Sequence, residues 1–371
     1  MKIGTISLNI NAPDFNYGAV LHSWAFQQYL KKLDCVDSVE IIDYTTPKLE
    51  GQNLKHPIIT SLKQRHLKKA CKYIAHYSAY MRRYRKFNSF IVNNLCVSKV
   101  RYDKKALNAA VLDYDCIICE SDVIWSQAFF GGNYDESFFL ALESMQKMKR
   151  IAYAPSMGDG DVNREQGERL RQLLQYPQYI SCRELYEKTI LEKYTEKSVT
   201  HVLDPVLLLE KEDYHKICAD RIENEPYLLL YLPVDDNSKL RSSASEYAKR
   251  NKLKIIEIST YLKETRGNNE VCYGSAGIEE FLSLIKYASV VFTNSFHAIC
   301  FSILFEVQFY AFSRSCAGKV KDICDVFGLQ DRYFEDDNFA ERSSINYSEL
   351  NKKRRNLVIQ SQDWLVNALK K

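Results

Sequence analysis

The chain of 371 residues is 46% apolar, which is enough material for two domains that each bury a hydrophobic core. This composition excludes a fibrous or disordered protein, and no uninterrupted apolar run reaches the length of about 18 residues that a membrane-spanning helix needs. The net charge is only +4, yet no Asp or Glu occurs between Glu50 and Asp103, so that stretch is strongly basic and the remainder is acidic.

Runs rich in β-forming residues alternate with helical patterns along most of the chain. The first run is followed by a helical pattern from about Ala19 to Leu33, and a long amphipathic pattern from Asn346 to Leu369 comes last. Such alternation predicts parallel sheets whose strands are joined by crossover helices. The predicted strands lie within residues 2–10, 39–44, 115–120, 150–156, 179–184, 199–205, 227–233, 254–259, 271–274, 290–295 and 308–313.

These strands fall into two groups, which predicts an α/β protein with two Rossmann-like domains that face each other across a cleft. We expect an N-terminal domain over residues 1–209 and a C-terminal domain over residues 210–345, on opposite sides of the cleft. The last helix, residues 346–371, is expected to run back to the N-terminal domain. The first strand has no charged or cleavable leader pattern, so we expect a cytoplasmic protein.

The basic stretch contains an amphipathic helical pattern over residues 63–91. Leu67, Ile74 and Phe87 belong to an apolar series with steps of three and four residues, and lysines and arginines cover the other faces. This pattern suits an anionic membrane surface and predicts peripheral association with the inner face of the membrane. The alternative is a core-facing helix with a solvated basic face. Nucleic acid is not expected as a partner, because no helix-turn-helix, RNP or zinc-finger pattern accompanies the charge.

Anion binding must come from basic side chains and helix N-termini, because the sequence has no glycine-rich nucleotide loop. The strongest candidate site follows the strand at 290–293, where Asn294 and Ser295 are good N-cap residues and His297 falls in the first helical turn. An imidazole in that place can exchange a proton beside a bound anion, which makes His297 the catalytic candidate. Side chains at this and other strand exits are the anion-binding candidates: Arg183, Ser295, Arg314, Lys319 and Lys321.

Two polar loops follow the first strand and the strand at 115–120. Hydrogen-bonding groups beside aromatic rings suit a sugar, and loop packing is the alternative. The predicted sugar contacts in these loops are Asp14, Asn16, Tyr17, His22, Asp122 and Trp125.

Two other patterns are interpreted as structural. Cys116 and Cys119 form a C-x-x-C within a strand-like run, and no second Cys or His pair at zinc-finger spacing accompanies them, so no metal is expected. Asp204 and Pro205 close another strand with a rigid turn.

Seven segments, taken in order, resemble the polysaccharide pyruvyl transferase family across roughly residues 3–325; they read NYGAVLHSWAFQQYL, CESDVIWS, IAYAPSMG, ISCREL, VLDPVLLL, EEFLSLIKYASVVFTNSFHA and FYAFSRSCAGKVKDI. The resemblance implies a fold like that of GT-B glycosyltransferases and phosphoenolpyruvate as the donor substrate, with no cofactor. The implied acceptor is a sugar of a cell-surface polysaccharide, such as a capsule or exopolysaccharide, or of its lipid-diphosphate-linked precursor. The resemblance implies that the domain over residues 1–209 is the acceptor side of the cleft and the domain over residues 210–345 the donor side. His297 matches the His of the family's S-F-H segment, Arg183 the Arg of S-x-R-E, and Lys319 the Lys of K-V.

The chain departs from the family pattern in the two polar loops. Where the family usually reads G-S-D-Q-x-W-N, Glu120, Val123 and Ser126 replace Gly, Gln and Asn. Where it often reads N-Y-G-A-x-L-Q, His22 replaces Gln. The S-F-H and S-x-R-E segments are intact, so the resemblance implies the donor more directly than the acceptor.

Two other functions fit the same sequence. A GT-B glycosyltransferase that uses a nucleotide sugar would share the architecture and the cleft. A noncatalytic membrane-surface or glycan-binding scaffold would use the basic helix as its functional part. Binding of phosphoenolpyruvate rather than nucleotide sugars would distinguish a pyruvyl transferase from the glycosyltransferase. Turnover that survives loss of the basic helix would count against the noncatalytic scaffold.

Overall fold

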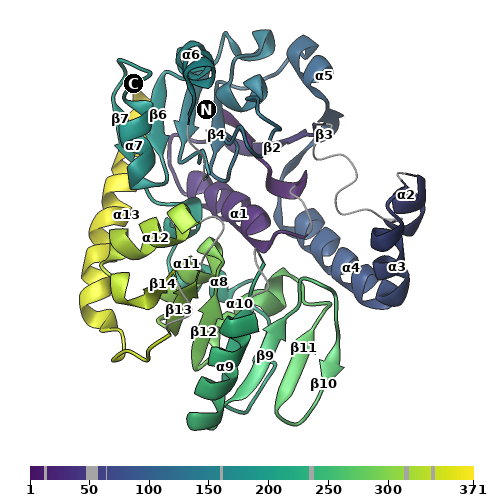
Figure 1. Cartoon of the computed structure of the whole chain (residues 1–371). Helices are drawn as coiled ribbons and strands as arrows, with labels where there is room; N and C mark the ends of the chain where they lie inside the picture. Colours follow the sequence, from purple (N-terminus) through teal and green to yellow (C-terminus); the bar gives the residue numbers. More distant parts are fainter. Residues whose placement is uncertain are drawn as a thin grey trace.

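Two seven-stranded sheets form the two halves of the chain (Figure 1). The strand order is β3-β2-β1-β4-β5-β6-β7 in the first sheet and β10-β11-β9-β8-β12-β13-β14 in the second. Among the described strands, all neighbours pair in parallel except β10 and β11. The structure, a computed structural model, describes residues 1–11, 15–46, 57–63, 65–158, 162–233, 238–312, 317–335 and 339–371.

The predicted α/β architecture with two parallel sheets is confirmed, and every predicted strand occurs. The first sheet contains β1 (Lys2–Ile6), β2 (Ser38–Tyr44), β3 (Val97–Tyr102), β4 (Cys116–Glu120), β5 (Lys149–Tyr153), β6 (Tyr179–Cys182) and β7 (Val199–His201). The second contains β8 (Tyr227–Tyr231), β9 (Lys254–Ile258), β10 (Thr265–Arg266), β11 (Glu270–Tyr273), β12 (Val290–Thr293), β13 (Gln308–Phe312) and β14 (Tyr333–Phe334).

Helices connect the strands and cover both sheets. In the first half they are α1 (Tyr17–Lys31), α2 (Pro57–Lys63), α3 (Leu67–Ala75), α4 (Tyr77–Asn94), α5 (Lys104–Ala109), α6 (Arg164–Leu173) and α7 (Leu185–Leu191), followed by the short helix η4 (Pro205–Leu207). In the second half they are α8 (Lys211–His215), α9 (Ser238–Arg250), α10 (Ile278–Lys286), α11 (Phe296–Phe305), α12 (Ala317–Phe327) and α13 (Tyr347–Lys370).

The basic segment differs from its prediction, since one continuous helix over residues 63–91 is wrong. Arg65 takes a left-handed backbone conformation with φ of 59° and separates α2 from α3, while His76 separates α3 from α4. The apolar periodicity continues across both breaks, so it could not reveal them. The sequence also missed β3, an edge strand whose side chains are half-buried or exposed and therefore lack an apolar pattern.

Helix α4 directs several of its basic side chains at the C-terminal half of the chain. Arg82 pairs with Glu264 and Lys86 pairs with Glu280. Arg83 is buried and donates hydrogen bonds to the backbone carbonyl oxygens of Ser259, at 2.8 Å, and Tyr273, at 3.4 Å. The interpretation of this part of the basic segment as a membrane-facing surface is therefore corrected: these side chains join the two halves of the protein.

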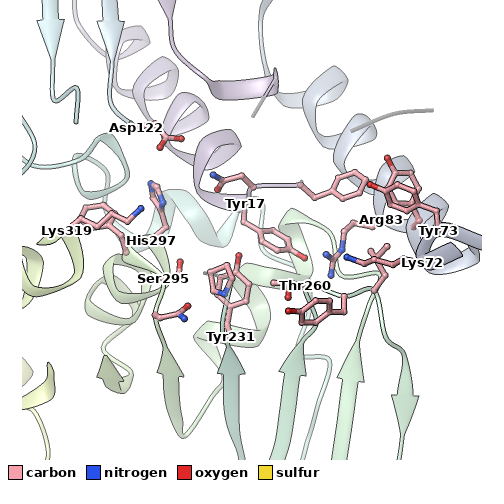
Figure 2. Close-up of a pocket in the computed structure, with 18 of the residues that line it drawn as sticks. Tyr17, Lys72, Tyr73, Arg83, Asp122, Tyr231, Thr260, Ser295, His297 and Lys319 are labelled. Atoms are coloured by element: carbon pink, nitrogen blue, oxygen red, sulfur yellow. The ribbon is translucent and has the colours of Figure 1, made fainter. Parts of the chain in front are cut away.

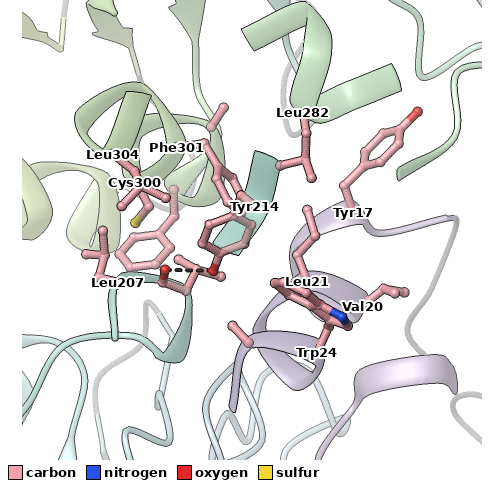
Figure 3. Close-up of a cluster of buried hydrophobic side chains, with 14 of the residues drawn as sticks. Tyr17, Val20, Leu21, Trp24, Leu207, Tyr214, Leu282, Cys300, Phe301 and Leu304 are labelled. Carbon is pink, nitrogen blue, oxygen red and sulfur yellow. Dashed lines mark hydrogen bonds between the residues drawn. The ribbon is translucent and has the colours of Figure 1, made fainter. Parts of the chain in front are cut away.

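A continuous hydrophobic core lies between the two sheets and is built by α1, η4, α10 and α11 (Figure 3). The ring of Tyr17 stacks on Phe281 with centroids 4.4 Å apart, and its hydroxyl donates to the carbonyl of Ala276 at 2.7 Å. Tyr214 donates a hydrogen bond to the carbonyl of Val206 at 2.7 Å across the same core. Because this core is shared, the two sheets hold a fixed cleft between their carboxyl edges.

Helix α13 runs along the side of the molecule to the first sheet (Figure 1). Its Ser361 hydroxyl accepts a hydrogen bond from the backbone N–H of Leu203 at 2.9 Å, and Lys149 donates to the carbonyl of Leu369 at 2.6 Å. The last helix thus contacts residues of the N-terminal half. Within the described ranges, none of the helices combines the length and the apolarity that crossing a bilayer requires.

The joining role of α4 yields a stability prediction. Arg83→Met should lower the free energy of unfolding by about 2 kcal/mol, because two carbonyl oxygens lose a charged donor. Arg85→Met, on the exposed face of the same helix, is the matched control and should change stability little. Urea denaturation of both variants measures the difference, and equal stabilities would contradict the assigned role of Arg83.

Candidate active site

A cavity of about 450 Å³ lies between the carboxyl edges of the two sheets (Figure 2). Open α/β sheets bind ligands at this edge, next to the point where the strand order reverses. The first half of the chain contributes Phe15, Asn16, Tyr17, Lys72, Tyr73, Tyr80, Arg83, Asp122 and Arg183. The second half contributes Tyr231, Pro233, Thr260, Tyr261, Leu262, Asn294, Ser295, Phe296, His297 and Lys319.

His297 reaches the cavity from the first turn of α11. Strand β12 ends at Thr293, and the Ser295 side chain caps the helix by accepting a hydrogen bond from the backbone N–H of Ala298 at 3.3 Å. The cap and the helix dipole favour a negative charge at this end of the helix. His297 and Lys319 lie together at one end of the cavity, and Asp122 lies above His297 in this view, at the same end (Figure 2).

Asp204 is the anionic centre beneath these groups. One carboxylate oxygen, Oδ2, accepts a hydrogen bond from the Ser121 hydroxyl at 2.6 Å and from Arg183 Nη1 at 3.3 Å, and it lies 3.6 Å from His297 Nε2. The other oxygen accepts from the backbone N–H of Val206 at 3.0 Å and so caps η4. The turn predicted at Asp204 is present, but the carboxylate also organises the site, which the sequence interpretation missed.

Arg183 is buried between two carboxylates and an aromatic ring. Its Nε donates to Glu184 at 2.7 Å, and its guanidinium carbon lies 4.3 Å from the centre of the Phe296 ring. Among the described residues, no hydrogen bond involves the remaining nitrogen, Nη2, so it is available to a ligand in the cavity that Arg183 lines. A planar guanidinium held in this way can bind a carboxylate or phosphate.

The charges in the site follow from burial and mutual contact. Burial raises the pKa of Asp204, but the charges of His297 and Arg183 outweigh it and hold that pKa far below its usual value. Burial lowers the pKa of His297, and the Asp204 carboxylate opposes this shift only in part. The imidazole is therefore mainly neutral at pH 7 before an anion binds. A bound phosphate would restore its proton.

Asp122 presents a second carboxylate to the cavity from the loop after β4. Its Oδ2 is buried and has no hydrogen-bond partner among the described residues, although His22 Nε2 lies 3.9 Å away. Burial raises the pKa of Asp122, yet the charges of His22, Arg183 and His297 lower it overall. An ionised oxygen of this kind can accept a hydrogen bond from a substrate hydroxyl.

The two departures His22 and Glu120 from the family pattern meet in the structure. His22 Nδ1 lies 3.2 Å from Glu120 Oε2, and both side chains are fully buried behind Asp122. Burial lowers the pKa of His22, but Glu120 and Asp122 raise it overall. A Gln and a Gly in the family pattern are thus replaced by a mutually compensating charged pair.

Gly18 is required by the position of His297. An added Cβ at Gly18 would lie 2.0 Å from His297 Nδ1, although Gly18 is within α1, where Ala would be favoured. The glycine of the N-Y-G-A segment therefore lets α1 of one half approach the catalytic candidate of the other.

The structure brings together some of the predicted site residues and separates others. Asn16 caps α1 by accepting from the backbone N–H of Ala19, and it lines the cavity together with Tyr17. His22 lies behind the cavity. Arg314 and Asp14 fall outside the described residues.

Two predicted contacts are corrected. Trp125 is fully buried, stacks on Phe139 with centroids 4.7 Å apart and donates to the carbonyl of Phe138, so its ring belongs to the core. Lys321 is exposed, lies 3.6 Å from Glu335 and does not line the described cavity. In both cases a cavity residue lies a few positions earlier in the sequence, Asp122 before Trp125 and Lys319 before Lys321, but the side chain points elsewhere.

The basic residues at the opposite end of the cavity belong to the segment that was predicted to bind a membrane or a lipid diphosphate, not to line this cavity. Lys72, Tyr73 and Arg83 lie there, away from His297 (Figure 2). Tyr261 faces Lys72 at 5.0 Å from ammonium to ring centre. The tyrosines interleaved with the basic residues were the available signal, and they were interpreted as membrane contacts instead.

Comparison with known proteins identifies the sequence family and the fold. The polysaccharide pyruvyl transferase family model matches residues 16–315. None of the curated proteins matches the chain. The UDP-GlcNAc 2-epimerase of Methanocaldococcus jannaschii is similar in structure, with a TM-score of 0.50, 13% identity and coverage of 96% of this chain and 93% of that one. A Listeria monocytogenes protein proposed to be a UDP-N-acetylglucosamine 2-epimerase has a TM-score of 0.52, 9% identity and coverage of 98% and 90%. At these identities the likeness concerns the fold alone, and it confirms the predicted GT-B-like class.

The close approach of Gly18 to His297 can be tested with Gly18→Ala, whose effect on stability should change sign when His297 is removed. Gly18→Ala should destabilise the wild-type protein by about 1 kcal/mol or more, because the new methyl group displaces the imidazole. In a His297→Ala background the same change should stabilise by up to about 1 kcal/mol, as expected for Ala in a helix. Denaturation of the four proteins measures the coupling, and an equal effect in both backgrounds would refute the contact.

The buried His22 and Glu120 pair predicts a pH-dependent stability. Because the pKa of His22 is raised on folding, its contribution is fully present below the ordinary value of about 6.5 and is lost as the pH rises through the folded-state pKa. Glu120→Gln should therefore lower the free energy of unfolding by about 3 kcal/mol near pH 6 and by clearly less near pH 9. Glu143→Gln, at an exposed site, is the control; a constant difference across this pH range would disprove the pairing.

Proposed function

Because the chain belongs to the polysaccharide pyruvyl transferase family, we propose that it uses phosphoenolpyruvate to form a pyruvate ketal on a sugar. The proposed acceptor is a sugar of a cell-surface polysaccharide or of its lipid-linked precursor. The observation that carries this proposal is the convergence of His297, Arg183 and Lys319 on one end of the cavity, at the N-terminus of α11. Arg183, Lys319 and the N-terminus of α11 thus all favour a bound anion, and they lie beside His297, which can transfer a proton.

The donor is proposed to bind with its anionic groups at this end. The Nη2 group of the Arg183 guanidinium and the Lys319 ammonium provide cationic donors, and the N-terminus of α11 adds its dipole. Asp204 keeps Arg183 in place and prevents the empty site from accumulating unbalanced positive charge. Both the carboxylate and the phosphate of phosphoenolpyruvate can be matched by these groups.

The reaction requires balanced transfer of two protons. A first sugar hydroxyl adds to C2 of phosphoenolpyruvate while C3 gains a proton, the C2–O bond to phosphate breaks, and a second hydroxyl closes the ketal ring. The loss of one hydroxyl proton is balanced by the proton that C3 gains. The other hydroxyl proton leaves on the phosphate, which is released as hydrogen phosphate. His297 is proposed to deliver the proton to C3, because a bound phosphate and Asp204 both support its charged form.

The acceptor is proposed to bind on the α1 side of the cavity. Asp122 offers an ionised oxygen to a sugar hydroxyl, and Asn16 and Tyr17 lie on the same wall. Accepting a hydrogen bond from the hydroxyl that attacks C2 raises its nucleophilicity and orients its lone pair. Tyr17 also joins the two halves of the core, so it fixes this wall relative to α10.

Donor binding is tested by thermal stabilisation with millimolar phosphoenolpyruvate, since a ligand that binds only the folded state raises the melting temperature. Wild type should be stabilised, and Lys319→Ala should lose most of this shift. Lys321→Ala is the matched control, because this neighbouring lysine lies outside the cavity, and it should keep the shift. Stabilisation by a nucleotide sugar but not by phosphoenolpyruvate would instead support the glycosyltransferase alternative.

The same preparation separates binding from chemistry. His297→Ala should retain much of the thermal shift but release phosphate from phosphoenolpyruvate plus acceptor on the order of a hundredfold more slowly, because the general acid is missing. A fully active His297→Ala protein would remove this histidine from the mechanism.

A further inference from the structure

Helices α2 and α3 project from the edge of the first half of the molecule (Figure 1). They expose four large aliphatic side chains: Ile59 and Leu62 on α2, and Leu67 and Ile74 on α3. Leu67 is 65% exposed and Ile74 is 60% exposed. The two lie seven positions apart and therefore on one face of α3, so the apolar surface is continuous along that helix.

The same two helices carry a concentrated positive charge. Residues 57–76 contain Lys63, Arg65, Lys68, Lys69 and Lys72 and no acidic residue. Lys68 and Lys69 are exposed and follow directly after Leu67, so the cations flank the apolar face. Lys72 lines the cavity, so the name "α2–α3 surface" is used below for Ile59, Leu62, Leu67, Ile74 and the four exposed cations Lys63, Arg65, Lys68 and Lys69.

This surface differs from the basic face of α4. In helix α4, Arg82, Arg83 and Lys86 contact the second half of the chain. In α3, Ala70 and Tyr73 are buried, and Tyr73 packs edge-on against Tyr80 of α4. Helix α3 is therefore anchored on one side while its aliphatic face is exposed to solvent.

We infer that the α2–α3 surface docks on an anionic lipid bilayer. Aliphatic side chains beside lysines and arginines match the two layers of such a surface, because the side chains enter the acyl boundary while the cations meet the headgroups. A second copy of the chain would bring these four exposed cations against four like charges, which disfavours self-association through this surface. Charge complementarity selects the bilayer.

The docked orientation places one end of the cavity near the lipid. Lys72 and Tyr73 belong to α3 and line the cavity at the end remote from His297 (Figure 2). If the proposed function holds, on which this step rests, a lipid-linked sugar enters at that end and extends toward His297. Membrane binding itself requires neither phosphoenolpyruvate nor turnover, so its test can fail separately from the proposed function.

The experiment is co-sedimentation of the full chain with vesicles of phosphatidylcholine containing about one-third phosphatidylglycerol, compared with phosphatidylcholine alone. One variant combines Leu67→Ser and Ile74→Ser, and another combines Lys68→Glu and Lys69→Glu. The matched control combines Lys352→Glu and Arg355→Glu, which makes the same change in net charge at exposed positions of α13. None of the substituted residues lines the cavity, so phosphate release with a water-soluble acceptor should stay unchanged.

Wild type and the α13 control should bind the anionic vesicles, and both α2–α3 variants should bind at least about tenfold more weakly. Binding should also weaken with added salt, because headgroup attraction is screened. Equal binding by all four proteins would overturn the inference. So would self-association of the wild type that the Leu67→Ser and Ile74→Ser variant abolishes, since the aliphatic face would then serve a second copy of the chain.

Discussion

The carboxylate of Asp204 holds the candidate site together by sharing its charge with two buried bases. Arg183 lies 3.3 Å from it and His297 3.6 Å, and these residues come from opposite halves of the chain. Buried cations are costly unless they are paired. The Asp204 carboxylate therefore allows the Arg183 guanidinium to be held inside the protein before an anionic donor arrives.

The geometry around Asp204 depends on contacts that have no polar chemistry. Gly18 removes the side chain that would occupy the position of His297 Nδ1. Tyr17, the residue before it, stacks on Phe281 and fixes α1 against α10. The interdomain core thus determines the distance between α1 and His297. In the short N-Y-G-A segment, Tyr17 packs in this core and Gly18 leaves space for the imidazole.

Much of the fold could be predicted because its signals are local. Buried parallel strands such as β4 and β8 are continuous apolar runs, and the Ser295 cap marks the start of α11. The breaks at Arg65 and His76 could not be predicted, because apolar periodicity continues through them. In the site, too, only the local signals could be predicted. His297 was identified because it follows a switch from strand to helix in the sequence. The direction of the Trp125 side chain and the long-range pairing of His22 with Glu120 depend on tertiary packing.

The central claim is that C2 of phosphoenolpyruvate becomes the ketal carbon of a sugar. The most direct test follows phosphoenolpyruvate labelled with carbon-13 at C2 by NMR, with the protein and a synthetic sugar acceptor in heavy water. The account predicts a labelled quaternary carbon bonded to two sugar oxygens, next to a methyl group that has gained a single deuteron at C3, with an equal amount of phosphate released. Recovery of the label only as phosphoenolpyruvate or free pyruvate, while a nucleotide sugar is consumed to glycosylate the same acceptor, would contradict it.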